Sequence, residues 1–230
     1  MSEIQQLFNR IAPNYDRLND WLSLGQHRIW KKMAIKWCMP QPGQRFLDLC
    51  CGSGDLALLL APSLYPNGKV VGIDFAEETL AIASQRTKSL PQYLQSSISW
   101  QKDDVLALKL ENQSFDGAIM AYGLRNVIDI PKCLQELHRV LKPGATAAIL
   151  DFHRPNTEVA ANFQAWYLAN VVVRLAVSLN IGAEYAYISP SLEKFPRGRE
   201  QENLAIAAGF SQAKHYPFLA GMMGILLLKS

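Results

Sequence analysis

Short apolar runs alternate with helical patterns through the middle of the chain. The runs have the length of strands and lie at 46–49, 69–74, 97–102, 115–121 and 145–151. Residues with apolar positions at helical spacing lie between them, at 56–61, 77–88 and 130–141. Strands joined by single helices form right-handed parallel crossovers, and a ligand then lies at the carboxyl ends of the strands. We therefore predict an α/β fold with a mostly parallel sheet.

The first 44 residues carry helical patterns of their own. Apolar residues recur at helical spacing over 4–11 and over 18–37, where the pattern is interrupted at 23–25 and ends before Pro40. Two interpretations remain open: a helical cap that only packs on the domain, and a lid over the bound ligands. Lids carry polar and aromatic groups in irregular stretches of this kind.

Residues 162–181 form an unusually apolar stretch with helical spacing. The stretch is too short to span a membrane and contains Arg174, so we expect no transmembrane helix. A core or dimer-interface helix is one interpretation, and the wall of a site for a long lipid tail is the other. The remaining elements are a polar and aromatic loop at 181–200, a helix at 202–208 and an antiparallel pair of strands at 211–217 and 222–228.

The composition is that of one globular domain. The chain has 230 residues, of which 49% are hydrophobic. We divide it into a helical lid (1–44), a cofactor-binding core (45–151), an apolar helix with a substrate loop (152–200) and a C-terminal helix with strands (201–230). The net charge is only +3 and the basic residues are scattered, so nucleic acid is not an expected partner. The four cysteines lack CxxC spacing, which indicates reduced thiols, and no signal or transit peptide is recognisable, so we expect a cytoplasmic protein.

The stretch 45–55 ends in a glycine turn that opens into a helix. Gly52 and Gly54 let the backbone take a positive φ and bring a ligand close to the first amides of that helix. Asp48 is unfavourable beside a pyrophosphate but suits an ammonium or sulfonium charge. Asp74 ends the next strand, 21 residues beyond Ser53, the usual place for an acid that binds both ribose hydroxyls. Together these residues predict a pocket for S-adenosylmethionine.

The same turn also fits a dinucleotide site. Residues 52–57 match the fingerprint GxGxxA, which is weak evidence when it stands alone. Helix-like residues precede the strand, whereas dinucleotide domains usually begin with it, and Asp48 would face the wrong charge. A nicotinamide-linked oxidoreductase or a non-catalytic nucleotide-binding protein is therefore the less favoured alternative.

Several motifs taken together resemble the ubiquinone and menaquinone C-methyltransferase family (UbiE/MenG). The most specific are Leu-Ser-Leu-Gly-Gln-His-Arg-Ile-Trp at 22–30 and Tyr-Gly-Leu-Arg-Asn-Val at 122–127. Further matching stretches extend the resemblance over essentially the whole chain and lie at 8–19, 47–55, 139–144, 187–191 and 195–196. The resemblance implies a class I S-adenosylmethionine-dependent methyltransferase. Its fold is a Rossmann-like, mostly parallel seven-stranded sheet with an antiparallel last strand and an N-terminal helical lid.

The segment 195–200 is similar to the branch of this family from oxygenic phototrophs. That branch methylates demethylphylloquinol, so the resemblance implies a phytylated or prenylated naphthoquinol as acceptor and S-adenosylhomocysteine as the second product. Demethylmenaquinol is an equivalent acceptor, and a ubiquinone-type benzoquinol or another lipid phenol is the alternative. Because such a lipid does not leave the bilayer readily, we expect transient, peripheral contact with a membrane surface. A homodimer is left open.

Position by position, the family motif places the contacts to the methyl donor. They fall on Ser53, Asp74, Asp104, Val105 and Ala121, to which we add Asp48, Gly52 and Gly54 from the turn and Phe75 directly after Asp74. Asp104 is preferred to Asp103 because it stands just before the small residue of the motif. Family members often have Ser where this chain has Ala121, so that only the backbone can bind there.

The acceptor must be the reduced quinol, because a carbon of the oxidised quinone is electrophilic. Removal of a hydroxyl proton gives a phenolate whose ring carbon can attack the methyl group in line. Arg125 can hold a phenolate oxygen or orient a water that takes the proton, and Asn126 can position the second oxygen. Arg125 could instead anchor the lid through a salt bridge, and we expect His153 to be a surface histidine. The remaining catalytic candidates are Tyr15, His27, Asp151 and His153. No metal site is recognisable.

Overall fold

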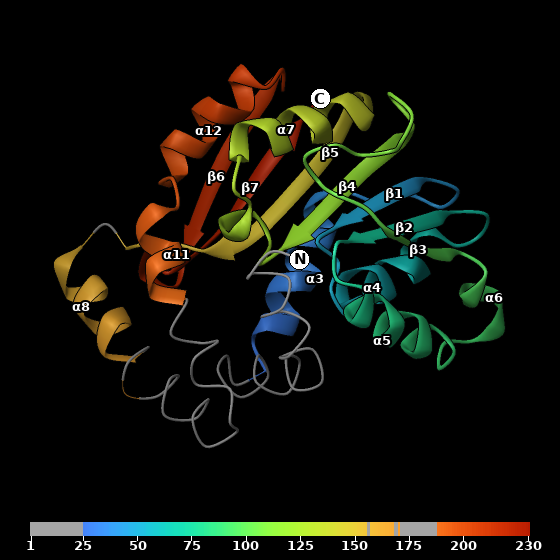
Figure 1. Ribbon diagram of the computed structural model, residues 1–230, viewed down its shortest axis with the longest axis horizontal. Helices are drawn as coiled ribbons and strands as arrows, with labels where there is room; N and C mark the ends of the chain where they lie inside the picture. Colours follow the sequence, from blue (N-terminus) through green and yellow to red (C-terminus); the bar gives the residue numbers. More distant parts are fainter. Residues whose placement is uncertain (1–24, 156, 168–169, 171–187) are drawn as a thin grey trace.

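A seven-stranded sheet forms the centre of the molecule (Figure 1). The computed structural model describes residues 25–155, 157–167, 170 and 188–230. The strands follow the order β3-β2-β1-β4-β5-β7-β6 across the sheet. Their bounds are β1 (Arg45–Leu49), β2 (Lys69–Asp74), β3 (Ile98–Lys102), β4 (Phe115–Ala121), β5 (Leu141–Phe152), β6 (Gln212–Phe218) and β7 (Met223–Lys229).

The first five strands are parallel, as the alternation of apolar runs and helices predicts. β1 lies between β2 and β4 and pairs in parallel with both, while β3 and β5 extend the parallel part of the sheet on either side. β7 is the antiparallel strand and lies between β5 and β6. Most of its residues are buried, whereas β6 alternates between exposed and half-buried positions and contains Pro217. Proline lacks a ladder N–H, which suits the edge position of β6.

Helices cover both faces of the sheet (Figure 1). On one face, apolar residues of α3 and α4 form a core with Phe46 of β1; on the other, α7 and α12 pack over Leu47 and Leu49. Because side chains of a strand alternate between faces, Asp48 points to the same face as Phe46. The helices are α3 (His27–Trp37), α4 (Asp55–Leu64), α5 (Glu77–Thr87), α6 (Gln92–Gln95), α7 (Ile130–Val140), α8 (Glu158–Tyr167), α11 (Ile188–Lys194) and α12 (Gly198–Ala207), with 3-10 turns η1 (Leu124–Asn126) and η3 (Leu219–Gly221).

The segment after β5 differs most from the sequence prediction. The predicted loop at 181–200 is wrong for its described part, because residues 188–194 form α11 and α12 begins at Gly198 rather than near Glu202. The backbone N–H of Arg197 donates to Glu200 Oε2 over 2.6 Å and so starts α12 early. The apolar stretch predicted as a helix at 162–181 begins within α8, and most of it lies outside the described residues.

α7 ends close to where the sequence predicts, but the connection to the next strand is shorter than expected. The helix ends at Val140 and β5 follows at once, so that residues 142–144 belong to the irregular start of this strand. Gly144 has a positive φ of 79°, a conformation that glycine adopts without strain. Among the helices that the structure describes, none has the length and apolar character needed to cross a bilayer.

Candidate active site

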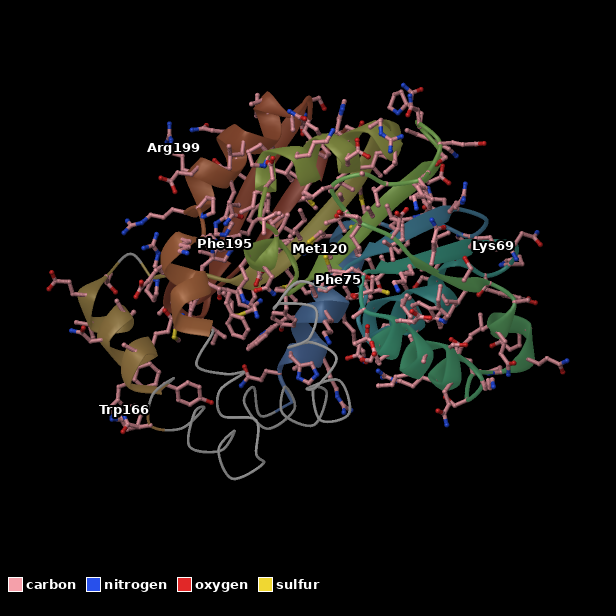
Figure 2. All side chains as sticks on the ribbon, in the orientation of Figure 1. Lys69, Phe75, Met120, Trp166, Phe195 and Arg199 are labelled. Carbon is pink, nitrogen blue, oxygen red and sulfur yellow. The ribbon has the colours of Figure 1, made fainter. Side chains whose placement is uncertain are left out.

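A cavity of about 690 Å³ lies at the carboxyl ends of the parallel strands. The lining residues come from the ends of four strands. Cys50 follows β1, Phe75 follows β2, residues 102–107 and Lys109 end and follow β3, and Gly123 and residues 126–128 follow β4. Figure 2 shows Phe75 in the middle of the molecule, whereas Arg199 and Trp166 lie at its periphery. The cavity therefore lies where a parallel α/β sheet places its ligand.

The two glycines of the turn have different surroundings. Both have a positive φ, 51° at Gly52 and 85° at Gly54. A Cβ on Gly52 would meet no atom of the described residues within 4 Å, so on their side this backbone is open to the close approach of a ligand. A Cβ on Gly54 would lie 2.4 Å from Cη2 of Trp100, so the absence of a side chain there is needed for packing against β3. The sequence analysis assigned both glycines to the ligand, and the contact with Trp100 gives Gly54 a structural reason.

Asp48 and Asp74 are both buried beside this turn. Asp74 accepts the backbone N–H of Gly52 (2.8 Å) and of Ala76 (2.9 Å), and burial raises its pKa. Asp48 is 1% exposed; its Oδ2 accepts the N–H of Ala57 at 2.9 Å, and its Oδ1 has no hydrogen-bond partner among the described residues. Burial raises the pKa of Asp48 to about 8.

An unfilled acceptor such as Asp48 Oδ1 costs about 1–3 kcal/mol in a protein interior. A cationic ligand would supply the missing partner, and the open backbone at Gly52 would let it approach. The residues present therefore fit S-adenosylmethionine, which carries both an ammonium and a sulfonium charge.

Asp103 and Asp104 differ in what they bind. Asp103 is buried, and its carboxylate accepts from the backbone N–H of Asp104 (3.0 Å) and of Lys109 (2.8 Å), which closes the loop after β3. Asp104 is exposed and lines the cavity together with Val105. Asp103 lines the cavity as well, so the choice of Asp104 as the donor-binding acid stays a prediction.

The predicted catalytic pair at 125 and 126 follows β4. Arg125 forms a buried ion pair with Asp151 at the end of β5, with Nη1 2.5 Å from Oδ1 and side-chain exposures of 8% and 1%. Its Nη1 also donates to the carbonyl of Tyr122, which accepts from Asn126 Nδ2 as well. Asn126 lines the cavity, and its Oδ1 is buried with no hydrogen-bond partner in the described part of the chain. Arg125 is thus held by Asp151, and Asn126 is the member of the pair that faces the cavity.

Other candidates lie elsewhere. His27 is buried at the first position of α3, and it is not among the residues that line the cavity. Tyr15 lies outside the described residues. Ala121 ends β4 and is half-buried. Groups of three or more His, Cys, Asp or Glu side chains suited to a metal ion are not found among the described residues.

The expectation that His153 is a surface histidine is wrong. The residue is 5% exposed because its ring packs against Phe195 after α11, and its Nε2 lies 3.1 Å from Nε2 of His215 on β6. Gln201 of α12 lies at its other ring nitrogen, Nδ1, at 3.5 Å. Burial, and then His215, lower the pKa of His153 to about 3. A neutral, enclosed ring of this kind is a poor proton acceptor near neutral pH.

A charged cluster beside the turn escaped the sequence analysis. Lys31 of α3 donates to Asp55 Oδ2 over 2.7 Å, and Arg86 of α5 binds Asp55 Oδ1 over 2.5 Å. Arg86 also donates to the Ser53 hydroxyl at 2.9 Å, so this hydroxyl has a protein partner. The sequence does show Asp55 in the first turn of the helix that directly follows the glycines. Its partners lie 24 and 31 residues away along the chain, so the sequence pattern around Asp55 does not indicate the cluster.

Comparison with known proteins places the chain in a family. The ubiE/COQ5 methyltransferase family matches residues 1–227. A protein of Nostoc sp. named 2-phytyl-1,4-naphtoquinone methyltransferase is 58% identical over 99% of this chain and 98% of its own length. A protein of Arabidopsis thaliana named 2-phytyl-1,4-beta-naphthoquinone methyltransferase, chloroplastic, is 46% identical over 98% of this chain and 87% of its own length.

A solved structure supports the fold. An S-adenosylmethionine-dependent methyltransferase from Aquifex aeolicus matches with a TM-score of 0.66 at 17% identity, over 93% of this chain and 97% of its own. At that identity the likeness speaks for the fold alone. Because the family match extends over nearly the whole chain, we conclude that this chain belongs to the ubiE/COQ5 methyltransferase family.

Proposed function

We propose that this methyltransferase moves the methyl group of S-adenosylmethionine to a ring carbon of a demethylated 2-phytyl-naphthoquinol, the last methylation of phylloquinone synthesis. The observation that carries the proposal is the identity of 46–58%, over nearly the whole chain, to relatives named for 2-phytyl-naphthoquinone methylation. Demethylmenaquinol has the same ring and is an equivalent acceptor, and a benzoquinol is the alternative.

The donor would lie along the carboxyl ends of β1 to β4. Asp104, Val105 and Phe75 line the cavity and suit the adenine end. Asp74 suits the ribose, since a carboxylate has about four lone-pair sites and the backbone N–H groups of Gly52, Ala76 and Phe75 do not use all of them. Asp48 and the open backbone at Gly52 suit the charged end, and the proposed contacts at Ser53, Gly54 and Ala121 complete the set. When bound, S-adenosylmethionine supplies an electrophilic methyl group on sulfur.

Arg125 and Asn126 would activate the acceptor. Loss of one hydroxyl proton makes the quinol a phenolate; its ring carbon then forms the new bond to the methyl carbon as the carbon–sulfur bond breaks, and the ring regains aromaticity by loss of its own proton. A fixed guanidinium stabilises a phenolate or orients the water that takes the proton. Asp151 keeps Arg125 in place, and the unfilled Oδ1 of Asn126 can accept a hydrogen bond from the second hydroxyl. Tyr15 and His27 remain candidates from the proposed N-terminal lid.

A lipid acceptor requires access to a membrane surface. α8 has no buried residue, and it exposes Val159 (82%), Phe163 (52%) and Trp166 (56%) at a spacing that places them on one side of the helix. We propose that the protein is cytoplasmic and touches the membrane transiently through this apolar side; a homodimer through the same side is the alternative. Flotation with anionic liposomes tests the contact: retention at low salt is expected, and no retention would contradict it.

An acceptor panel tests the function directly. Purified protein is incubated anaerobically with labelled S-adenosylmethionine and either reduced demethylnaphthoquinol or reduced demethoxybenzoquinol of the same tail. We expect methyl transfer to the naphthoquinol, and none when the same ring is supplied as the oxidised quinone. A higher kcat/KM for the benzoquinol would overturn the proposed acceptor.

A further inference from the structure

Lys31 carries a buried positive charge on α3. The residue is 4% exposed, and its Nζ donates to Asp55 Oδ2, 2.7 Å away at the first residue of α4. The ammonium also lies over the ring of Tyr122, 5.7 Å from the centroid. An ammonium group has three N–H donors. Within the part of the chain that the structure describes, Asp55 is the acceptor for one of them. A buried cation with unfilled donors is unfavourable unless a further acceptor binds it.

Lys31 also shares its counter-charge with a second cation. Asp55 binds Arg86 through its other oxygen, so one carboxylate serves two positive groups. Burial alone would raise the pKa of Asp55, but Lys31 and then Arg86 lower it below its ordinary value, which keeps the carboxylate ionised at neutral pH. Lys31 therefore shares its carboxylate with a second cation directly beside the glycine turn, and its remaining donors suit an anionic ligand group.

Asp48, close to Lys31, is an acid that has an unfilled hydrogen-bond acceptor in the described part of the chain. Asp48 has a buried Oδ1 with no hydrogen-bond partner among the described residues, and Lys31 is close enough to oppose the rise in the pKa of Asp48. Both groups lie at the carboxyl edge of the sheet, Asp48 near the end of β1 and Lys31 over Tyr122 after β4. The unfilled N–H donors of Lys31 suit a carboxylate, and the unfilled acceptor of Asp48 suits an ammonium group. Together they are complementary to a zwitterion.

We propose that Lys31 binds the α-carboxylate of the methionine end of S-adenosylmethionine, opposite Asp48, which takes the ammonium group. The proposal rests on S-adenosylmethionine as the methyl donor. Charge identifies the end of the donor that faces Lys31, because adenine and ribose are neutral and the sulfonium is positive. A phenolate oxygen of the acceptor is the other anion that could reach Lys31, but it would leave Asp48 Oδ1 without a partner. α3 thereby joins the N-terminal region to the donor.

The test compares two ligands that differ in the amino-acid end. S-Adenosylhomocysteine carries the carboxylate, whereas 5′-methylthioadenosine keeps the adenosine and the thioether but lacks the amino acid. Isothermal titration of both ligands is made on the wild-type protein, on Lys31→Met and on Lys32→Met, a matched control because Lys32 is exposed on the same helix. Lys31→Met should weaken S-adenosylhomocysteine about 10- to 100-fold, as for a charged hydrogen bond, and leave 5′-methylthioadenosine unchanged. Lys32→Met should change neither.

Three results would overturn the proposal. Equal weakening of both ligands by Lys31→Met would give Lys31 a structural role, and unchanged affinities with a raised KM for the quinol would place Lys31 at the acceptor. Asp55→Asn gives an independent reading if Lys31→Met does not fold. Freed from its partner, Lys31 should keep or improve the preference for S-adenosylhomocysteine, and loss of that preference would count against it. If wild-type protein binds neither ligand, the donor itself is wrong, which is a separate failure.

Discussion

Replacing Asp151 by Asn should destabilise the protein by about 3–5 kcal/mol, because it removes one partner of the buried ion pair that Asp151 forms with Arg125. The two side chains are only 1% and 8% exposed, and their atoms approach to 2.5 Å. The same carboxylate accepts the backbone N–H of Arg125 (3.1 Å) and of Phe152 (2.8 Å). An Asn side chain has nearly the same shape but is neutral and offers one acceptor oxygen in place of two.

The loss is large against the total stability of a domain, which is about 5–15 kcal/mol. Urea unfolding followed by circular dichroism measures it, with an unchanged m-value as the sign that the folded state is intact. Asp116→Asn is the matched control: Lys142 lies 2.6 Å from Asp116, but the side chains are 46% and 23% exposed, so we expect a loss of at most about 1 kcal/mol.

A double variant tests the reason for the loss. Arg125→Met combined with Asp151→Asn removes both charges, so it should be more stable than Asp151→Asn alone even though it contains more substitutions. If the double variant is no more stable, or if Asp151→Asn costs no more than Asp116→Asn, the loss does not come from breaking the buried ion pair.

Three further predictions concern the turn and the histidine pair. Burial, and then His215, lower the pKa of His153 to about 3, so between pH 6.5 and pH 3 only the unfolded chain gains a proton at this residue. The free energy of unfolding should therefore fall by about 1.4 kcal/mol for each pH unit below 6.5. Unfolding curves measured over this pH range should show a flatter profile for His153→Gln. Gly54→Ala should lower the thermal midpoint of the ligand-free protein because its Cβ would overlap Trp100. Gly52→Ala should chiefly weaken the stabilisation by S-adenosylhomocysteine. Equal midpoints for the two ligand-free variants would refute these different roles of the glycines. Asp48→Asn should raise apo-protein stability at pH 6, where the buried carboxyl has a raised pKa, and weaken donor binding; tighter binding would contradict the assigned role.

The order of elements followed from local pattern. Strands β2 and β4 have the predicted bounds, 69–74 and 115–121, because an apolar run between polar residues is a property of neighbouring positions in the chain. The same holds for the acids Asp48 and Asp74, whose place at strand ends follows from the length of those runs. The letters of the glycine turn alone left a dinucleotide site open, and the match to a methyltransferase family over residues 1–227 decides against it.

Only the tertiary structure decided which distant groups meet. Asp151 pairs with Arg125 across 26 residues, His153 with His215 across 62, and Lys31 with Asp55 across 24. Such contacts depend on how β5 lies beside β4 and how α3 packs against α4, and no local pattern records them. The burial of His153 was mispredicted for the same reason. By itself the sequence determined the sheet and the acids at its carboxyl edge, and the packing of segments far apart in the chain determined which charges there are neutralised and which remain for a ligand.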